Sequence, residues 1–321
     1  MSEQTHSALE HFPITFFTTV MGMSGLTLAL HAGERALGLT DATSTVALAA
    51  TVALFVVVAV TYAAKARRYP SAVAAEWNHP VKLAFFPAVS ISLLLMATAM
   101  LGRFPDVAHG MWLLGMGLQG ILTLAVVSGW ISSRAFVHGH LSPAWFIPAV
   151  GNVIVPIAGA QMGYVEISWF FMSVGLIFWI VLLTLVMNRL IFHDPLPGRL
   201  QPTLVILIAP PAVGFLAWLQ LNGGVIDPMA RILLNGAYLF GLIVAVQLPR
   251  ILKLPFAMSF WALSFPVAAV TIASLVYADA TESLFHQMLG LALLAALAVI
   301  IAGLVIRTSR AVAAGAVFQP E

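Results

Sequence analysis

The stretch SPAWFIPAVGNVIVPIAGAQMGYVEISWFFMSVGLIFWIVLLTLVMN, residues 142–188, contains the unit from which this fold is built. Its first apolar segment, 143–163, begins with Pro143 and carries two further prolines, Pro148 and Pro156, whereas the second, 167–191, which continues three residues past the quoted stretch, carries none. A helix needs about 20 apolar residues to cross a hydrocarbon core of about 30 Å, so each segment can span a membrane. An interior proline removes a backbone hydrogen bond and bends a helix. We therefore interpret the stretch as a kinked helix followed by a straight one.

Apolar segments of this kind fill almost the whole chain. The sequence is 61% hydrophobic and only 8% charged, against about 25% charged residues in an ordinary soluble domain. We predict ten transmembrane helices, at residues 13–32, 44–64, 81–102, 109–132, 143–163, 167–191, 202–221, 229–249, 256–277 and 284–306. A single membrane domain, 13–306, then lies between an N-terminal segment, 1–12, and a C-terminal tail, 307–321, both cytoplasmic.

The prolines divide the ten spans into two classes. Six lie inside spans, and all six fall in odd-numbered ones: Pro87, Pro148, Pro156, Pro210, Pro211 and Pro266. The first span lacks such a proline and has Gly22 and Gly25 instead, so its bend is not predicted. Prolines are frequent in membrane helices generally, which is the alternative explanation. We favour five parallel hairpins related by an axis along the membrane normal. This predicts an all-α membrane protein with an inner ring of five kinked odd helices around a central pore and an outer ring of five even helices.

The basic residues predict the orientation. With the N-terminus on the cytoplasmic side, 11 of the 14 Lys and Arg residues lie on that side. The other three, Arg35, Arg103 and Arg231, lie on the opposite side. Cytoplasmic loops of membrane proteins carry such an excess of Lys and Arg, so both termini are expected in the cytoplasm.

The middle of every span is free of Asp, Glu, Lys, Arg and His. Titratable groups at that depth mark proton relays and coupled carriers, and their absence argues against proton coupling, a buried metal and an intramembrane protease. The sequence also has no phosphate loop, dinucleotide fingerprint or haem-ligand pair. We expect no enzyme, no cofactor, no metal and no nucleic-acid partner.

An uncharged pore can still be closed by an apolar side chain that excludes water. Phe265 directly precedes Pro266 in WALSFPVAA, residues 261–269, near the middle of the ninth span, and is therefore the candidate gate. Small and polar residues of the odd spans are candidates for the lining: Thr19, Gly22, Ser90, Asn152, Pro211, Ser264 and Pro266.

Four segments at odd spans resemble a known family: HPVKLAFFPA (79–88), SPAWFIPAVGN (142–152), LQPTLVILIAPPA (200–212) and SFWALSFPV (259–267). Over roughly 12–310 the chain is similar to the tellurite-resistance and dicarboxylate transporter family, which includes TehA-like bacterial proteins and plant guard-cell slow anion channels. The resemblance implies a homotrimer in the bacterial inner membrane, with a pore in each protomer. It also implies that Phe265 matches the gating phenylalanine and Lys82 the basic residue at the cytoplasmic mouth.

Three functions remain open. The leading hypothesis is a passive channel for chloride, nitrate or similar small anions. The second is a carrier in the same fold that exports sulfite, a dicarboxylate or a tellurium oxyanion. The third is a membrane scaffold with a closed axis, against which the small residues of the odd spans argue. The expected partners are small anions, membrane lipid and the two other copies of the chain in a homotrimer.

Overall fold

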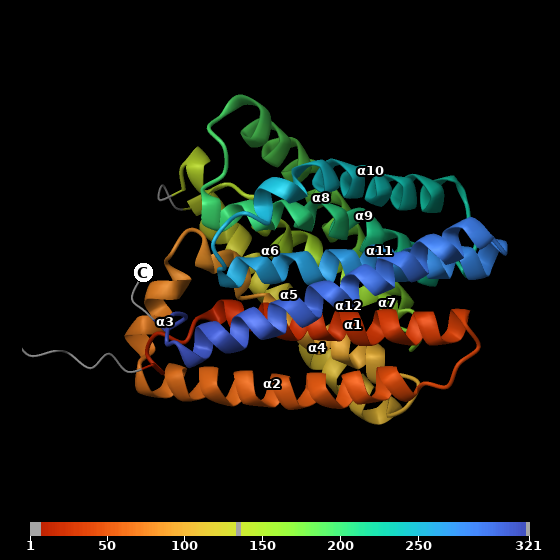
Figure 1. Cartoon of the computed structure of the whole chain (residues 1–321), viewed down its shortest axis with the longest axis horizontal. Coiled ribbons are helices and arrows are strands. Elements are labelled where there is room, and N and C mark those ends of the chain that lie inside the picture. The colour runs from red at the N-terminus through yellow and green to blue at the C-terminus, as the bar shows by residue number, and fades with distance from the viewer. Residues whose placement is uncertain (1–7, 133–135, 319–321) are drawn as a thin grey trace, which may run out of the picture.

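The computed structural model describes residues 8–132 and 136–318 (Figure 1). Throughout these residues the chain forms helices and turns without a strand, which confirms the all-helical prediction. Arg134, the first seven residues of the N-terminal segment and the last three of the tail lie outside the described residues. The long helices lie side by side in one bundle (Figure 1).

The even-numbered spans are single long helices. They are α2 (Ala42–Arg68), α5 (Pro105–Ser132), α8 (Val165–Phe192), α10 (Pro228–Ile251) and α12 (Leu284–Ala313). Pro228 opens α10 at a position where its missing N–H needs no partner, and Asp227 caps the same end by accepting from Ala230 N at 2.8 Å. The tenth span is longer than predicted, because α12 continues past residue 306 to Ala313.

The odd-numbered spans change winding along their length. Each begins with a 3-10 segment and continues as α-helix: η1 (Ile14–Phe16) before α1 (Phe17–Ala36), η2 (Lys82–Phe85) before α4 (Ala88–Met100), η6 (Gly198–Ile208) before α9 (Ala209–Leu221), and η7 (Met258–Leu263) before α11 (Ser264–Thr281). The fifth span alternates the two forms, as η4 (Pro143–Trp145), α6 (Phe146–Val150), η5 (Gly151–Ile154) and α7 (Val155–Gly159).

The interior prolines mark these changes of winding. Pro87 is the N-cap of α4, Pro210 lies in the first turn of α9, and Pro266 lies in the first turn of α11. A proline in the first helical turn lacks an N–H that would have no intrahelical acceptor anyway. The prolines therefore start new α-helical segments and do not simply bend continuous helices.

The described residues contain nine helices long and apolar enough to cross a membrane, compared with the ten spans predicted. The difference is the fifth span, where the apolar run Pro143–Gly159 is shorter and interrupted. A second difference is in the connection between the predicted spans 44–64 and 81–102. It contains a further short helix, α3 (Pro70–Trp77), that is not among the ten predicted.

Burial separates the two classes of span. The comparison uses an apolar window of 18 residues in each span. In the first, third, seventh and ninth spans 61–78% of these residues are buried, whereas in the five even spans 22–33% are buried. Among the described elements, each even helix contacts the odd span before it and the odd span after it. For α12 the next odd span is α1, at the beginning of the chain.

Polar contacts fasten inner segments to the outer helix α5. Ser90 on α4 donates from Oγ to Gln119 Oε1 at 2.7 Å, and Asn152 on η5 donates from Nδ2 to Thr123 Oγ1 at 3.0 Å. All four residues are buried. Buried polar groups in an apolar bundle need such partners, so these bonds fix how the third and fifth spans rotate against α5.

A buried ion pair holds the start of the first span. Lys65 Nζ on α2 lies 2.9 Å from Glu76 Oε2 on α3, and only 2% and 6% of the two side chains are exposed. Glu76 Oε1 accepts from Ile14 N at 3.2 Å, and Lys65 Nζ donates to Phe12 O at 2.9 Å. The corner between α2 and α3 therefore fixes the backbone that leads into α1.

The two ends of the described chain meet at one end of the bundle. Phe318 stacks on both Phe12 and Phe16, with ring centroids 6.2 Å apart in each case. These contacts therefore join the segment before α1 to the segment after α12.

Candidate functional site

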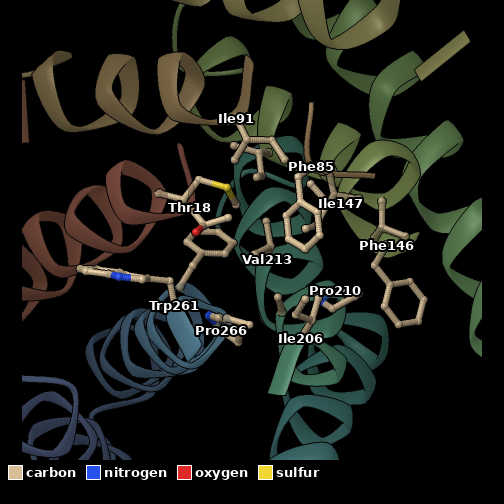
Figure 2. A pocket seen from close by; sticks show the side chains of 18 of the residues that line it. Thr18, Phe85, Ile91, Phe146, Ile147, Ile206, Pro210, Val213, Trp261 and Pro266 are labelled. Atoms are coloured by element: carbon tan, nitrogen blue, oxygen red, sulfur yellow. The ribbon is translucent and has the colours of Figure 1, made fainter. Parts of the chain in front are cut away.

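A narrow cavity of about 70 Å³ lies among the odd spans, close to their 3-10 segments. Each odd span supplies part of its wall, for example Thr18, Phe85, Phe146, Ile206 and Trp261. Figure 2 shows Thr18, Phe85 and Val213 converging on this space from different elements. Its lining is almost wholly apolar, because the side chains that face it are aliphatic and aromatic.

A second, wide cavity of about 280 Å³ lies toward the far ends of the same spans. The residues at its wall again come from all five odd spans: Leu28 on α1, Leu95 on α4, Ile157 on α7, Leu216 on α9 and Ala269 on α11. It also contains charged and polar groups, namely His31, Arg35, Gln220 and Asp279. The wide cavity can therefore hold water and ions, in contrast to the narrow one.

Phe265 and Val213 belong to the walls of both cavities. Phe265 is the second residue of α11, directly before Pro266 in the first turn of that helix. Its side chain is half-buried, as expected for a ring with open space beside it. These two side chains therefore lie between the narrow and the wide cavity.

The position of Phe265 depends on a glycine of α1. A Cβ atom added to Gly25 would lie 3.3 Å from Phe265 Cδ2 and 2.8 Å from Ala268 Cβ. One turn earlier, a Cβ added to Gly22 would lie 2.3 Å from Ser264 Oγ. The two glycines thus allow α1 to approach α11 closely at the level of Phe265.

Of the residues predicted to form the pore, Phe265 and Pro266 line the narrow cavity. The other predicted lining residues are placed in contacts between helices or within their own segment. Ser90 and Asn152 bond to α5, as described above. Thr19 donates to Phe16 O at 2.6 Å, and Ser264 donates to Trp261 O at 2.6 Å.

Gly22 and Pro211 are placed similarly. Gly22 faces Ser264 and Trp261, and Pro211 Cβ lies 3.5 Å from where a Cβ of Gly236 on α10 would be. The narrow cavity is lined by residues adjacent in sequence to three of the predicted ones: Thr18, Gly151 and Pro210 stand directly before Thr19, Asn152 and Pro211. Successive side chains of an α-helix point about 100° apart around its axis. The 3-10 segments have fewer residues per turn, so the sequence alone does not determine which of two neighbouring side chains faces the cavity.

Lys82, predicted at the cytoplasmic mouth, is the first residue of η2 and is half-buried. Its backbone N–H donates to His79 Nδ1 at 3.2 Å. Lys82 is not among the residues that line either cavity. The cationic residue that the sequence reasoning missed is Arg35, which lines the wide cavity at the opposite end. The sequence marks Arg35 only as one of three basic residues on that side.

Comparisons with known proteins agree on one family. The family described as voltage-dependent anion channel (SLAC1) matches residues 11–309. The S-type anion channel SLAH2 of Arabidopsis thaliana is 29% identical over 315 residues, which cover 93% of this chain and 60% of the relative. SLAH3 of the same plant is 30% identical over 80% of this chain and 41% of the relative.

A bacterial relative is covered more evenly. The tellurite resistance protein TehA homolog of Haemophilus influenzae is 26% identical over 80% of this chain and 79% of its own length. The chain spans about 60% and 41% of the lengths of the two plant channels, so these relatives contain long regions that the match does not include.

Proposed function

Because this chain belongs to the SLAC1 family of voltage-dependent anion channels, we propose that it is a passive channel for small anions such as chloride and nitrate. The conduction path follows the axis of the odd spans in each protomer, through the wide and the narrow cavity. Phe265 closes the path. The observation that carries this proposal is the presence of Phe265 in the walls of both cavities.

The arrangement of the hairpins supports such a path. Each even helix contacts the odd span on either side of it, and α12 returns to α1. The described lining residues of both cavities come from the odd spans. Both observations favour five hairpins in a closed ring, with the odd spans inside. In this reading α1 completes the ring as a continuous helix, and the other odd spans are broken at their prolines.

Phe265 can close the path without binding the anion. An anion that passes an apolar ring in a narrow space loses water and gains no hydrogen bond, at a cost of several kcal/mol. Each 1.4 kcal/mol of barrier lowers a rate by about tenfold. The narrow cavity offers little compensation because its lining is almost wholly apolar, so the closed state conducts very little.

Phe265→Ala tests the proposal directly. Removal of the ring joins the two cavities, and we expect the chloride and nitrate currents of purified protein in planar bilayers to rise at least tenfold. Under a salt gradient the reversal potential should lie near the equilibrium potential of the anion. A reversal potential near that of the cation would exclude an anion channel.

The stability of the same variant separates a gate from a core residue. Phe265 borders open space, so its loss should cost less than the roughly 3–5 kcal/mol of a fully buried Phe→Ala change. Phe215→Ala on α9 is the matched control, because Phe215 is 0% exposed. If Phe265→Ala lowers the unfolding temperature as much as Phe215→Ala and leaves the current unchanged, Phe265 is a packing residue.

A carrier for sulfite, a dicarboxylate or a tellurium oxyanion is the second candidate. The wide cavity favours it, because Arg35 and Gln220 could bind an oxyanion in a cavity closed at one end by Phe265. A carrier would show saturating tracer flux and no bilayer current in the Phe265→Ala variant, whereas a channel shows current.

The setting of the path completes the proposal. The chain is an integral membrane protein. We place it in a bacterial inner membrane as a homotrimer, with residues 13–306 as the channel domain and the segments 1–12 and 307–321 in the cytoplasm. Cross-linking in membranes tests the trimer. The chain has no cysteine, so a single cysteine in place of the exposed Leu37 tests the orientation: an impermeant thiol reagent should label it from outside intact cells.

A further inference from the structure

Three potential metal ligands meet where α1 connects to α2. One ligand atom each from His31, Glu34 and Asp41 lie within 4.8 Å of one another. His31 and Glu34 belong to the last turns of α1, and Asp41 is the residue before α2. His31 also lines the wide cavity, so this cluster lies at the rim of that cavity.

The Glu34 carboxylate has one oxygen engaged and one without a partner. Oε1 accepts from the backbone N–H groups of Thr43 at 2.7 Å and Ser44 at 3.0 Å, and also from the Thr43 hydroxyl. These bonds satisfy the first N–H groups of α2. Glu34 is only 4% exposed, and its Oε2 is buried without a hydrogen-bond partner. A buried carboxylate oxygen without a donor is costly and indicates that a cation belongs beside it.

Asp41 shows the same division between its two oxygens. Its Oδ2 lies 3.5 Å from a guanidinium nitrogen of Arg103, which also donates to Ser44 Oγ at 3.0 Å. Its Oδ1 lies 3.3 Å from His31 Nδ1, but His31 Nδ1 has no partner in hydrogen-bond geometry. Arg103 offsets one of the two carboxylate charges, and the second remains without a countercharge in the cluster.

We infer that His31, Glu34 and Asp41 form a Zn²⁺ site. Zn²⁺ binds imidazole nitrogen and carboxylate oxygen at about 2.0–2.2 Å and often keeps one position for water. An imidazole ligand favours Zn²⁺ over Mg²⁺, which prefers an all-oxygen shell. The contacts of Glu34 Oε1 and Asp41 Oδ2 resemble the outer hydrogen bonds that orient carboxylate ligands in metal sites. The three ligand atoms lie within 4.8 Å of one another, so Zn²⁺ binding requires the side chains to rotate until the atoms reach coordination distance.

Bound Zn²⁺ joins the end of α1 to the start of α2 and adds positive charge at the rim of the wide cavity. The site lies at the rim of the wide cavity, on the proposed conduction path, but Zn²⁺ binding there involves neither Phe265 nor the narrow cavity. Binding can therefore be measured without any current, and its failure would leave the channel proposal untouched.

The test uses the full chain, purified in detergent and freed of metal with a chelator. Zn²⁺ titration should raise the unfolding temperature, because a ligand that binds only the folded state stabilises it by mass action, and calorimetry gives the Kd. His31→Ala and Asp41→Asn should each weaken Zn²⁺ binding at least tenfold. Mg²⁺ at the same concentration should have no effect. His109→Ala is the matched control: His109 lies at the same end of the bundle but bonds to Tyr164 Oη at 2.7 Å.

Two results would overturn the inference. If His31→Ala and Asp41→Asn bind Zn²⁺ as tightly as the parent protein, or if His109→Ala loses binding equally, the ion binds elsewhere. If Zn²⁺ neither raises the unfolding temperature nor gives a heat of binding, the cluster is not a Zn²⁺ site. Asp41→Asn preserves the shape of the side chain, so it keeps the test valid if His31→Ala misfolds.

Discussion

Gly25 on α1 packs against both Ala268 and the proposed gate, Phe265, on α11. In Gly25→Ala the new methyl group would lie 2.8 Å from Ala268 Cβ, which is attached to the backbone and cannot rotate away. Overpacking of this kind costs about 1–3 kcal/mol. The same methyl group would lie 3.3 Å from Phe265 Cδ2 and should displace the ring from the position in which it closes the path. We therefore expect lower thermal stability and a larger anion current in bilayers.

Gly117→Ala is the control for this prediction. Gly117 lies on α5, and a Cβ there meets nothing within 4 Å, so only the higher helix propensity of alanine should act, by up to about 1 kcal/mol in the stabilising direction. If Gly25→Ala unfolds at the same temperature as Gly117→Ala and conducts like the parent, then the contact between α1 and α11 does not position Phe265.

The sequence could predict some single residues and not others, for a geometric reason. Phe265 stands out in the sequence because it directly precedes a proline near the middle of a span. Its side chain lines both cavities, and its role as the gate stays a prediction. The polarity of Ser90 and Asn152 predicts a place in the pore lining, but polar side chains in an apolar bundle also bond to a neighbouring helix. Both do so with α5. Residue type therefore could not distinguish a lining role from a packing role.

At the level of elements, the corner between α2 and α3 offers a test of how the first inner helix is held. Lys65→Met removes the cation and leaves the Glu76 carboxylate buried, which should cost about 3–5 kcal/mol. The double variant Lys65→Met, Glu76→Gln leaves no unpaired charge and should recover part of this stability. Thermal unfolding of the parent, the two single variants and the double variant gives the coupling between the residues. Strictly additive effects would show that the pair at 2.9 Å does not act as a unit.

The element order was predictable because membrane crossing demands long apolar runs. The bounds of the inner spans were less so. A 3-10 segment such as η6, with 11 residues, is longer than the few residues usual for this form, and no local signal in the sequence separates it from α-helix. The same holds for α3, whose eight residues are too few for a periodic pattern to predict.

At the scale of the whole molecule, the charges in the wide cavity should control the entry of anions. A unit charge about 10 Å from an anion in water changes its energy by about 0.4 kcal/mol, or about twofold in occupancy. We therefore expect Arg35→Gln to lower, and Asp279→Asn to raise, single-channel conductance about twofold at low salt in the Phe265→Ala background. Both effects should vanish near 1 M salt, where the Debye length is about 3 Å.

Two further variants make this comparison specific. Arg231→Gln removes a charge at the same end of the bundle, but Arg231 donates to Tyr277 Oη at 2.8 Å and is not among the residues that line the wide cavity. Lys82→Ala removes the charge predicted at the other mouth. If Arg35→Gln and Asp279→Asn shift the conductance in the same direction, or Arg231→Gln has the larger effect, the wide cavity is not where anions gather.

The presence of Phe265 between the two cavities has an electrical consequence. If the wide cavity is filled with electrolyte, it is nearly equipotential, and the membrane voltage falls mainly across the short dry segment at Phe265. A unit charge that crosses 100 mV exchanges about 2.3 kcal/mol with the field. The phenyl ring itself carries no net charge, so the field does almost no work when the ring moves. Voltage would then act on the permeating ion and hardly at all on the gate, and the open probability would vary only weakly with membrane potential.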